Sequence, residues 1–410
     1  MKKTVLMLLA LLLVLLAGSA MAVSGLQVSR QEDGTAEITK YTGRDTKLVI
    51  PETINGMAVT SIGEEAFYEC ESLITVILPD GLKYIGKGAF LACENLERIR
   101  VPSGVSYIGE EAFRNCRSLK RISLPDGLSK ISYRCFENCK SLTEFTVPDG
   151  VGFIDSMAFY SCEELTRVNL PDSLNSFGRN PFSYCFKLVE FSVSPDNPNL
   201  EVIDGVLYTR EGRALISYPL SKTDTVYEIP EGTLEIGDNA FDYAGLLTEI
   251  IIPDSVHTIG RFAFDHCSGL TRLELPAGIR YVTNEMAENC ASLETVTIPE
   301  GVSSIGRCAF DNCTALKNIN IPDSVEKIGD NAFSSCKSLT EIDIPENVIS
   351  IDYCAFSNCI SLKSLTIPRG MEEIGRGVFN NCPELTVTVF RGTVGEEYCT
   401  SNNIPFVYAD

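Results

Sequence analysis

Residues 316–336 read LKNINIPDSVEKIGDNAFSSC, which places a short apolar segment, a Pro-Asp-Ser turn, an Ile-Gly pair, an Ala-Phe pair and a cysteine in a fixed order. The same order recurs every 23 residues on either side of this stretch. The cysteines that mark the period are Cys70, Cys93, Cys116, Cys139, Cys162, Cys185, Cys267, Cys290, Cys313, Cys336, Cys359 and Cys382. So strict a period is typical of a solenoid, in which each coil returns every side chain to the same place on the stack. The function is therefore expected on an extended surface rather than in one pocket.

Each position of the repeated unit has a mechanical reason. The alternating apolar residues of 339–344 predict a strand with one buried face, and Pro345 ends it because proline withholds a backbone donor. The glycine of the Ile-Gly pair, such as Gly329, suggests a tight or left-handed backbone position, and the phenylalanine fills the far side of the coil. One unit buries too little apolar surface to offset its own conformational entropy, so the coils must stack. The expected fold class is a mainly-β repeat solenoid.

The period is interrupted once, where the proline slot falls on Ser194. Two apolar stretches follow, at 202–208 and 214–218, joined by a polar loop, and they predict a β-hairpin island embedded in the solenoid. A solenoid must also hide its last apolar layer at each end, which predicts two caps. The expected organisation is an N-terminal cap at 23–60, repeat block 1 at 61–194, the island at 195–229, repeat block 2 at 230–390 and a C-terminal cap at 391–410.

The N-terminus is typical of an export signal. Lys2 and Lys3 precede an apolar run over residues 5–17, and Ala20-Met21-Ala22 fits a small-x-small cleavage site. The run is shorter than the roughly 20 residues that a membrane span needs. Residues 1–22 are therefore predicted to be a signal peptide, and the mature protein is expected to be secreted or held at the cell surface without membrane insertion.

Charge and composition exclude several classes of function. The formal net charge is −21, and loss of the two signal-peptide lysines makes it more negative still. Nucleic acids and anionic membranes are therefore not expected partners. The chain has only two histidines, His257 and His266, and it carries no H-E-x-x-H, G-x-S-x-G or phosphate-loop motif. His266 stands beside Cys267, but that cysteine belongs to the periodic column, so the pair is not interpreted as catalytic. No enzyme activity and no cofactor are predicted.

The repeat resembles a known family. The string from Leu316 to Cys336 is similar to the BspA-type leucine-rich repeats of bacterial and protist surface and secreted proteins, and the likeness spans most of residues 38–390. The resemblance implies a leucine-rich-repeat horseshoe. It also implies a role in adhesion or recognition, with a protein or glycan on a host or neighbouring cell as the partner.

The periodic cysteines are interpreted as a buried ladder of free thiols. Successive coils of a stack lie about 4.8 Å apart, whereas the Cβ atoms of a disulfide lie roughly 3.5–4.5 Å apart. Bonds between neighbouring coils would therefore be strained. Ala244 occupies the same column, which indicates that a small apolar group suffices there. A zinc site at the close pairs Cys135/Cys139 and Cys308/Cys313 is disfavoured, since no histidine or paired C-x-x-C accompanies them.

Two sets of surface residues are candidates for ligand contact. Outward strand positions on the expected concave face carry an arginine cluster, which is either an anion-binding site or a solvated sheet face. A second column carries aromatic residues, which are either a binding hot spot or packing under an edge. The arginines are Arg98, Arg100, Arg121 and Arg167, and the aromatic residues are Tyr84, Tyr107, Phe153 and Tyr281.

The leading functional hypothesis is a secreted, non-catalytic binding protein that recognises a protein or glycan through the solenoid surface. One alternative is a purely structural envelope or spacer protein. Another is an enzyme or inhibitor module built on the island. The aspartates that follow the proline in many units are compatible with a calcium ladder or with turn chemistry, and turn chemistry is favoured because Ser103 and Ala277 occupy the same slot.

Overall fold

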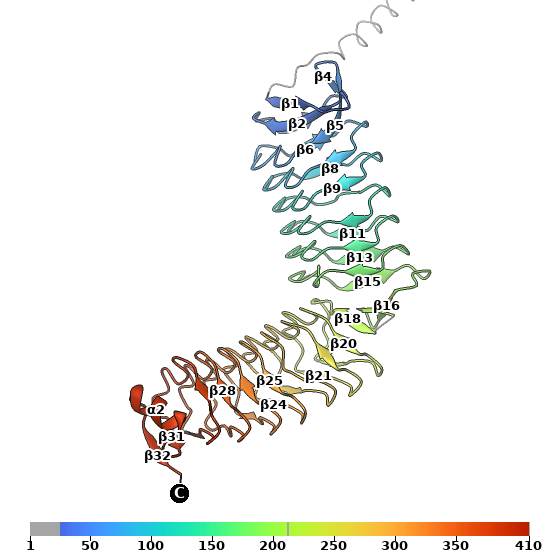
Figure 1. Ribbon diagram of the computed structural model, residues 1–410. Coiled ribbons are helices and arrows are strands. Elements are labelled where there is room, and N and C mark those ends of the chain that lie inside the picture. The colour runs from blue at the N-terminus through green and yellow to red at the C-terminus, as the bar shows by residue number, and fades with distance from the viewer. Residues whose placement is uncertain (1–24, 211–212, 410) are drawn as a thin grey trace, which may run out of the picture.

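Two ladders of short parallel strands and a third, turn-rich side run along the chain, and each coil contributes one segment to each (Figure 1). The computed structural model describes residues 25–210 and 213–409; the predicted signal peptide at 1–22 lies outside the described residues. The chain is a mainly-β solenoid of about 16 turns with a spacing of about 23 residues, as the sequence predicted.

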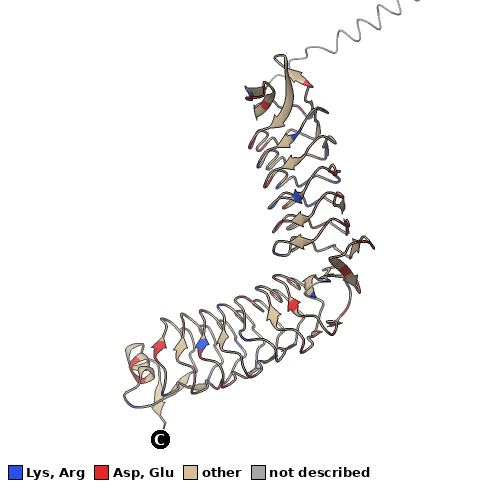
Figure 2. Ribbon diagram, turned by 45° about the vertical axis from the view of Figure 1, so that its right-hand side comes forward, with Lys and Arg blue, Asp and Glu red and all other residues tan. Residues whose placement is uncertain are grey.

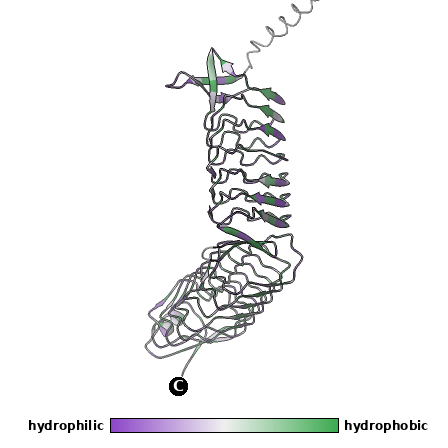
Figure 3. Ribbon diagram, turned by 90° about the vertical axis from the view of Figure 1, so that its right-hand side faces the viewer, coloured by the Kyte–Doolittle hydropathy of each residue, from purple (hydrophilic) through white to green (hydrophobic). Residues whose placement is uncertain are grey.

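Ladder A is formed by the segment that precedes the proline. Its strands pair at the repeat spacing, as in Thr75 with Arg98, and they alternate buried and exposed residues. Figure 3 shows this alternation as hydrophobic and hydrophilic colours on the same strands. The strands are β3 (Lys47–Val49), β6 (Thr75–Ile77), β8 (Arg98–Arg100), β11 (Glu144–Thr146), β13 (Arg167–Leu170), β15 (Glu190–Val193), β19 (Val226–Glu228), β21 (Glu249–Ile251), β23 (Arg272–Glu274), β24 (Thr295–Thr297), β26 (Asn318–Ile319), β29 (Ser364–Thr366), β31 (Thr386–Val389) and β32 (Phe406–Tyr408).

In most coils, ladder B is formed by the isoleucine of the Ile-Gly pair and the residue before it. It contains β2 (Ala36–Tyr41), β5 (Met57–Ile62), β7 (Tyr84–Ile85), β9 (Tyr107–Ile108), β10 (Lys130–Ile131), β12 (Phe153–Ile154), β14 (Ser176–Phe177), β18 (Ala214–Ser217), β20 (Glu235–Ile236), β22 (Thr258–Ile259), β25 (Ser304–Ile305), β27 (Lys327–Ile328), β28 (Ser350–Ile351) and β30 (Glu373–Ile374). The other elements are β1 (Leu26–Arg30), β4 (Thr53–Ile54), β16 (Leu200–Ile203), β17 (Val206–Thr209) and α2 (Val394–Ser401).

The glycine of the Ile-Gly pair is required by close approach between coils, and the predicted left-handed alternative is wrong. A Cβ on Gly329 would lie 2.9 Å from the backbone nitrogen of Arg307 in the preceding coil, and one on Gly109 would lie 2.5 Å from that of Lys87. Neither glycine has a positive φ. Where this slot holds Ser132, its hydroxyl donates to the Ile108 carbonyl at 2.6 Å, and ladder B is interrupted between β9 and β10.

Residues in the left-handed conformation occur instead on the turn side, at the second position before the phenylalanine and the second position after it. In the first full coil these are Glu65 and Glu69, with φ of 51° and 54°. The amides of Glu65, Phe67 and Glu69 each donate to a carbonyl of the next coil, at 2.8–2.9 Å. Asparagine, which tolerates this conformation, often fills the second position, and the Asn138 amide donates to Asn115 of the preceding coil at 2.9 Å. The turn side is thus a third hydrogen-bonded ladder that needs no regular strand.

The interior is a column of stacked rings. Phe90 and Phe113, one coil apart, have centroids 5.5 Å apart with an angle of 1° between the ring planes, and both are fully buried. The column is interrupted between Phe264 and Phe310, where Met286 and Ala287 replace the Ala-Phe pair. Burial of these side chains in coil after coil provides the stabilisation that one unit lacks.

The stack consists of two blocks that meet at an angle (Figure 1), and their interiors form two separate hydrophobic cores. Between them lie β16, β17 and β18, which form an antiparallel sheet. The sequence predicted two strands here, and the structure has three because Asp204-Gly205, both with positive φ, form a tight turn inside the first predicted strand. β18 also pairs in parallel with β20, so it is the first ladder B strand of block 2.

Candidate functional site

The outer face of ladder A carries the predicted arginine cluster. Arg98 and Arg121 occupy equivalent positions in neighbouring coils and are joined by a parallel β-bridge. Both side chains are exposed, and neither has an ion-pair partner within 4.0 Å among the described residues. Arg100 lies 3.9 Å from Asp80, and both of these side chains are largely exposed. These three arginines lie on neighbouring positions of the same ladder and are called here the arginine face.

Arg167 does not belong to the arginine face. Its Nε donates to Glu190 at 2.8 Å, and a second guanidinium nitrogen contacts the same carboxylate. The coil of Glu144 also lies between Arg121 and Arg167. Ladder A opens between Arg121 and Glu144, which leaves a shallow groove lined by Arg121, Ser123, Asp126, Glu144, Thr146 and Asp149. The groove therefore has arginine on one wall and carboxylates around it.

The predicted aromatic column is only partly assembled. The rings of Tyr84 and Tyr107 stack with centroids 4.7 Å apart and planes 3° apart, and each residue is 39% exposed. Phe153 lies two coils beyond Tyr107, with Lys130 between them on ladder B. Tyr281 lies in block 2 and is 56% exposed. The structure thus provides one stacked tyrosine pair and two separate rings.

The periodic cysteines are free thiols, and all except the half-buried Cys70 and Cys382 are buried. Each buried thiol donates to the carbonyl of the residue in the phenylalanine slot of the preceding coil, as Cys93 does to Phe67 at 3.0 Å and Cys313 to Ala287 at 3.2 Å. Burial raises the pKa of these thiols, to about 12 for Cys185. The thiolate that nucleophilic or metal chemistry needs is therefore disfavoured.

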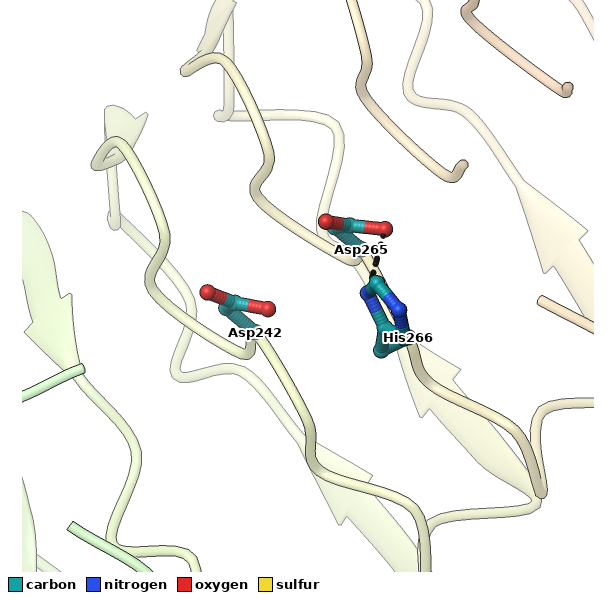
Figure 4. A group of neighbouring side chains, drawn as sticks. All are labelled: Asp242, Asp265 and His266. Atoms are coloured by element: carbon teal, nitrogen blue, oxygen red, sulfur yellow. Dashed lines mark ion pairs between the residues drawn. The ribbon is translucent and has the colours of Figure 1, made fainter. Parts of the chain in front are cut away.

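Sequence reasoning missed a polar cluster on the turn side of the block junction. Tyr184 of block 1 packs on Tyr243 of block 2 with centroids 4.5 Å apart, and Tyr243 stacks on His266 at 4.2 Å. Beside His266 lie the buried carboxylates of Asp242 and Asp265 (Figure 4). The sequence pattern that could have revealed this cluster is the position after the phenylalanine slot, which is acidic in four successive units. These residues are Asp242, Asp265, Glu288 and Asp311.

A family model describes nearly the whole solenoid. The model of the BspA type leucine rich repeat region matches residues 41–162, 88–203, 224–338 and 284–403. The chain belongs to the BspA-type leucine-rich repeat family. No curated protein sequence matches it.

Solved structures of leucine-rich repeat proteins are similar to this BspA-type chain over most of its length. A leucine rich cell surface protein from Faecalibacterium prausnitzii is 28% identical with a TM-score of 0.59, and the match covers 92% of this chain and 95% of the other. A leucine-rich repeat protein from Bacteroides ovatus is 26% identical with a TM-score of 0.56, covering 94% and 99%. A leucine-rich repeat protein from Eubacterium ventriosum has a TM-score of 0.70 at 22% identity, covering 87% and 93%, and supports the fold alone.

These matches place this BspA-type protein among leucine-rich repeat proteins that include a cell-surface protein. None of the helices in the described residues is long and apolar enough to cross a bilayer. Acidic and basic residues are interspersed along both blocks (Figure 2).

Proposed function

We propose that this protein is an exported, non-catalytic recognition protein that binds an anionic partner on a host or neighbouring cell through the arginine face. The partner would be a protein or glycan bearing carboxylates or sulfates. The observation that carries the proposal is the pair Arg98 and Arg121, two exposed guanidinium groups in adjacent coils without carboxylate partners. Many other outward cations of the solenoid are already paired, as Lys120 is with Glu97 at 3.1 Å.

Charge arrangement supports this choice of surface. A chain with a net charge of −21 repels anionic partners at long range, so a local cationic patch must supply the contact. Guanidinium groups bind carboxylates and sulfates with two parallel hydrogen bonds, and neighbouring coils present Arg98 and Arg121 side by side. The stacked pair Tyr84 and Tyr107 offers a flat, half-exposed surface on ladder B of the same block, and such rings are frequent at interfaces.

The test is binding of the purified mature chain to immobilised heparin and to a panel of extracellular matrix proteins. The double variant Arg98→Glu/Arg121→Glu is expected to weaken binding by at least about tenfold, because two attractive contacts become repulsive. Arg272→Glu is the matched control, since it lies at the same ladder position in block 2 and already pairs with Glu274 at 2.7 Å. Equal binding by the wild type, the double variant and the control would refute the arginine face as the site.

A spacer role is the second candidate, and the same panel distinguishes it. A purely structural protein would bind none of the probes, while its thermal melt would be unchanged by any of these exposed substitutions. Binding that the double variant abolishes, with an unchanged melt, would favour recognition.

A further inference from the structure

We propose that Asp242, Asp265 and His266 bind a divalent transition-metal ion of the zinc class on the turn side of the block junction. One ligand atom from each residue lies within 4.8 Å of the others. Figure 4 shows the Asp242 carboxylate turned toward the pair formed by Asp265 and His266. The ligands come from two successive coils, so the stacking of the solenoid itself assembles the site.

Two other places in the molecule show how the fold treats a buried carboxylate. Glu137 is buried in the same column of block 1, and its Oε2 lies 3.3 Å from Nε of Arg114 and 3.2 Å from Nε of Arg134. Glu285, also buried, contacts both Arg261 and Arg307. Each buried carboxylate thus has two arginines, in keeping with the high cost of an uncompensated buried charge.

Asp242 and Asp265 have no such compensation. They are 3% and 7% exposed, yet no Lys or Arg nitrogen of the described residues lies within the 4.0 Å of an ion pair from either carboxylate. The one basic group at hand is His266, whose Nδ1 lies 2.9 Å from Oδ1 of Asp265. Oδ1 of Asp265 also accepts a hydrogen bond from the uncharged side-chain amide of Asn289 at 3.3 Å. A divalent cation would balance the negative charge of the two buried carboxylates.

An unpartnered atom points to the same conclusion. One oxygen of Asp242, Oδ2, accepts from Asn239 at 3.1 Å, but Oδ1 is buried without a hydrogen-bond partner. Unpaired buried polar atoms are rare in folded proteins, and an absent ion is one of their ordinary explanations.

The ligand chemistry selects the ion. Two carboxylate oxygens and one imidazole nitrogen suit zinc or a similar divalent transition metal, whereas calcium prefers six to eight oxygen ligands. Zinc bonds of about 2.0–2.2 Å place tetrahedral ligand atoms roughly 3.4 Å apart, which small side-chain movements would reach from the observed separations. The His266 side chain is 35% exposed, so solvent has access, and water is expected to complete the coordination.

The position also suggests what the ion does. The stack of Tyr184, Tyr243 and His266 crosses from block 1 into block 2. An ion bound by His266 and the two aspartates fixes the last ring of this stack and ties the coil of Asp242 to the next one. The bound ion is therefore expected to stiffen the junction and to slow amide exchange around Tyr243.

The chain offers consensus substitutions for the test. His266 lies in a left-handed position that asparagine fills in later units, as at Asn289 and Asn312, so His266→Asn should fold normally. Asp242→Ser places in the slot the serine found at Ser334 and Ser357. His257→Asn is the matched control, because His257 is exposed, lies outside the cluster and is the other histidine of the chain.

The experiment is titration of the metal-stripped mature chain with zinc chloride in a calorimeter, with cobalt absorption to identify the ligands. We expect one ion per chain for the wild type and for His257→Asn. Each of the two cluster variants should bind at least about 100-fold more weakly, since even outer-shell changes cost about 10- to 100-fold. Equal affinities for His266→Asn and His257→Asn would overturn the proposal, as would a cobalt spectrum with thiolate charge-transfer bands. If His266→Asn does not fold, the zinc affinity of Asp242→Ser is compared with that of the wild type, and equal affinities would overturn the proposal.

Discussion

The gap in the phenylalanine column provides a sharp test of how the coils are packed. In one unit the Ala-Phe pair is replaced by Met286 and Ala287, and both residues are fully buried in the block 2 core. The volume that a phenylalanine fills elsewhere is here expected to be filled by the methionine from the neighbouring position. The two substitutions are then a compensating pair, and reverting only one of them should be costly.

The magnitudes follow from burial. Met286→Ala removes a fully buried side chain and should cost about 2–5 kcal/mol. Ala287→Phe alone forces a ring into a space that Met286 occupies, and overpacking of this kind costs about 1–3 kcal/mol. The double variant restores the consensus Ala-Phe pair and a ring between Phe264 and Phe310, so we expect its stability within about 1.5 kcal/mol of wild type. The coupling between the two positions is therefore several kcal/mol.

The assay is a double-mutant cycle measured by urea unfolding, followed by circular dichroism and tyrosine fluorescence because the chain has no tryptophan. Repeat arrays can unfold in parts, so amide exchange of the block 2 coils should accompany the cycle. If the two single effects simply add in the double variant, Met286 does not fill the ring position, and the packing argument is refuted.

Three further predictions concern the thiols, ladder B and the junction. Burial raises the pKa of the thiols, so their contribution to stability is present below about pH 9 and is lost as the pH rises toward the pKa in the folded protein, about 12 for Cys185. In that range each buried thiol should lower the free energy of unfolding by about 1.4 kcal/mol per pH unit. The urea midpoint should therefore fall steeply above about pH 9, and less steeply in Cys185→Ala. Ser132→Gly should let the amide of residue 132 bond to the Ile108 carbonyl, seen as slower exchange of that amide. Leu207→Ala should speed exchange mainly in block 1 and Val206→Ala mainly in block 2, because the two side chains are buried in different cores.

The period alone was enough to predict most of the fold. Because each coil repeats its residues at a fixed interval, the pairing of Thr75 with Arg98 and the stacking of Phe90 on Phe113 follow directly from the spacing. The role of Gly329 did not follow, since a glycine required by the backbone of another coil and one required by its own φ look alike in a sequence. Positive φ at Glu65 and Glu69 was hidden for a related reason, because their side chains do not signal that conformation.

The candidate site was predictable only in part. Alternation placed Arg98 and Arg121 on the outside of one ladder, but the pairing of Arg167 with Glu190 depends on rotamers that no pattern specifies. The cluster around His266 was missed because its residues were weighed singly rather than by column. Reading the position after the phenylalanine down the stack would have shown successive acids without the arginines that accompany Glu137.

The junction shows why the period had to be interrupted. On β17 the side chains alternate between the two cores, with Val206 and Tyr208 in that of block 2 and Leu207 in that of block 1. A solenoid coil has one buried side, whereas a strand buried on both faces can close two cores at once. The hydroxyl of Tyr208, which β17 brings into the second core, has a hydrogen-bond partner there, the hydroxyl of Tyr227 at 2.8 Å. The strands β16 to β18 are added on the side of ladder B, whereas on the turn side Tyr184 packs directly on Tyr243. The junction is therefore wider on the side of ladder B, and the second block is turned away from the axis of the first (Figure 1). The bend and the polar cluster beside it both lie where the interval between successive proline slots, from Ser194 to Pro230, is longer than one repeat.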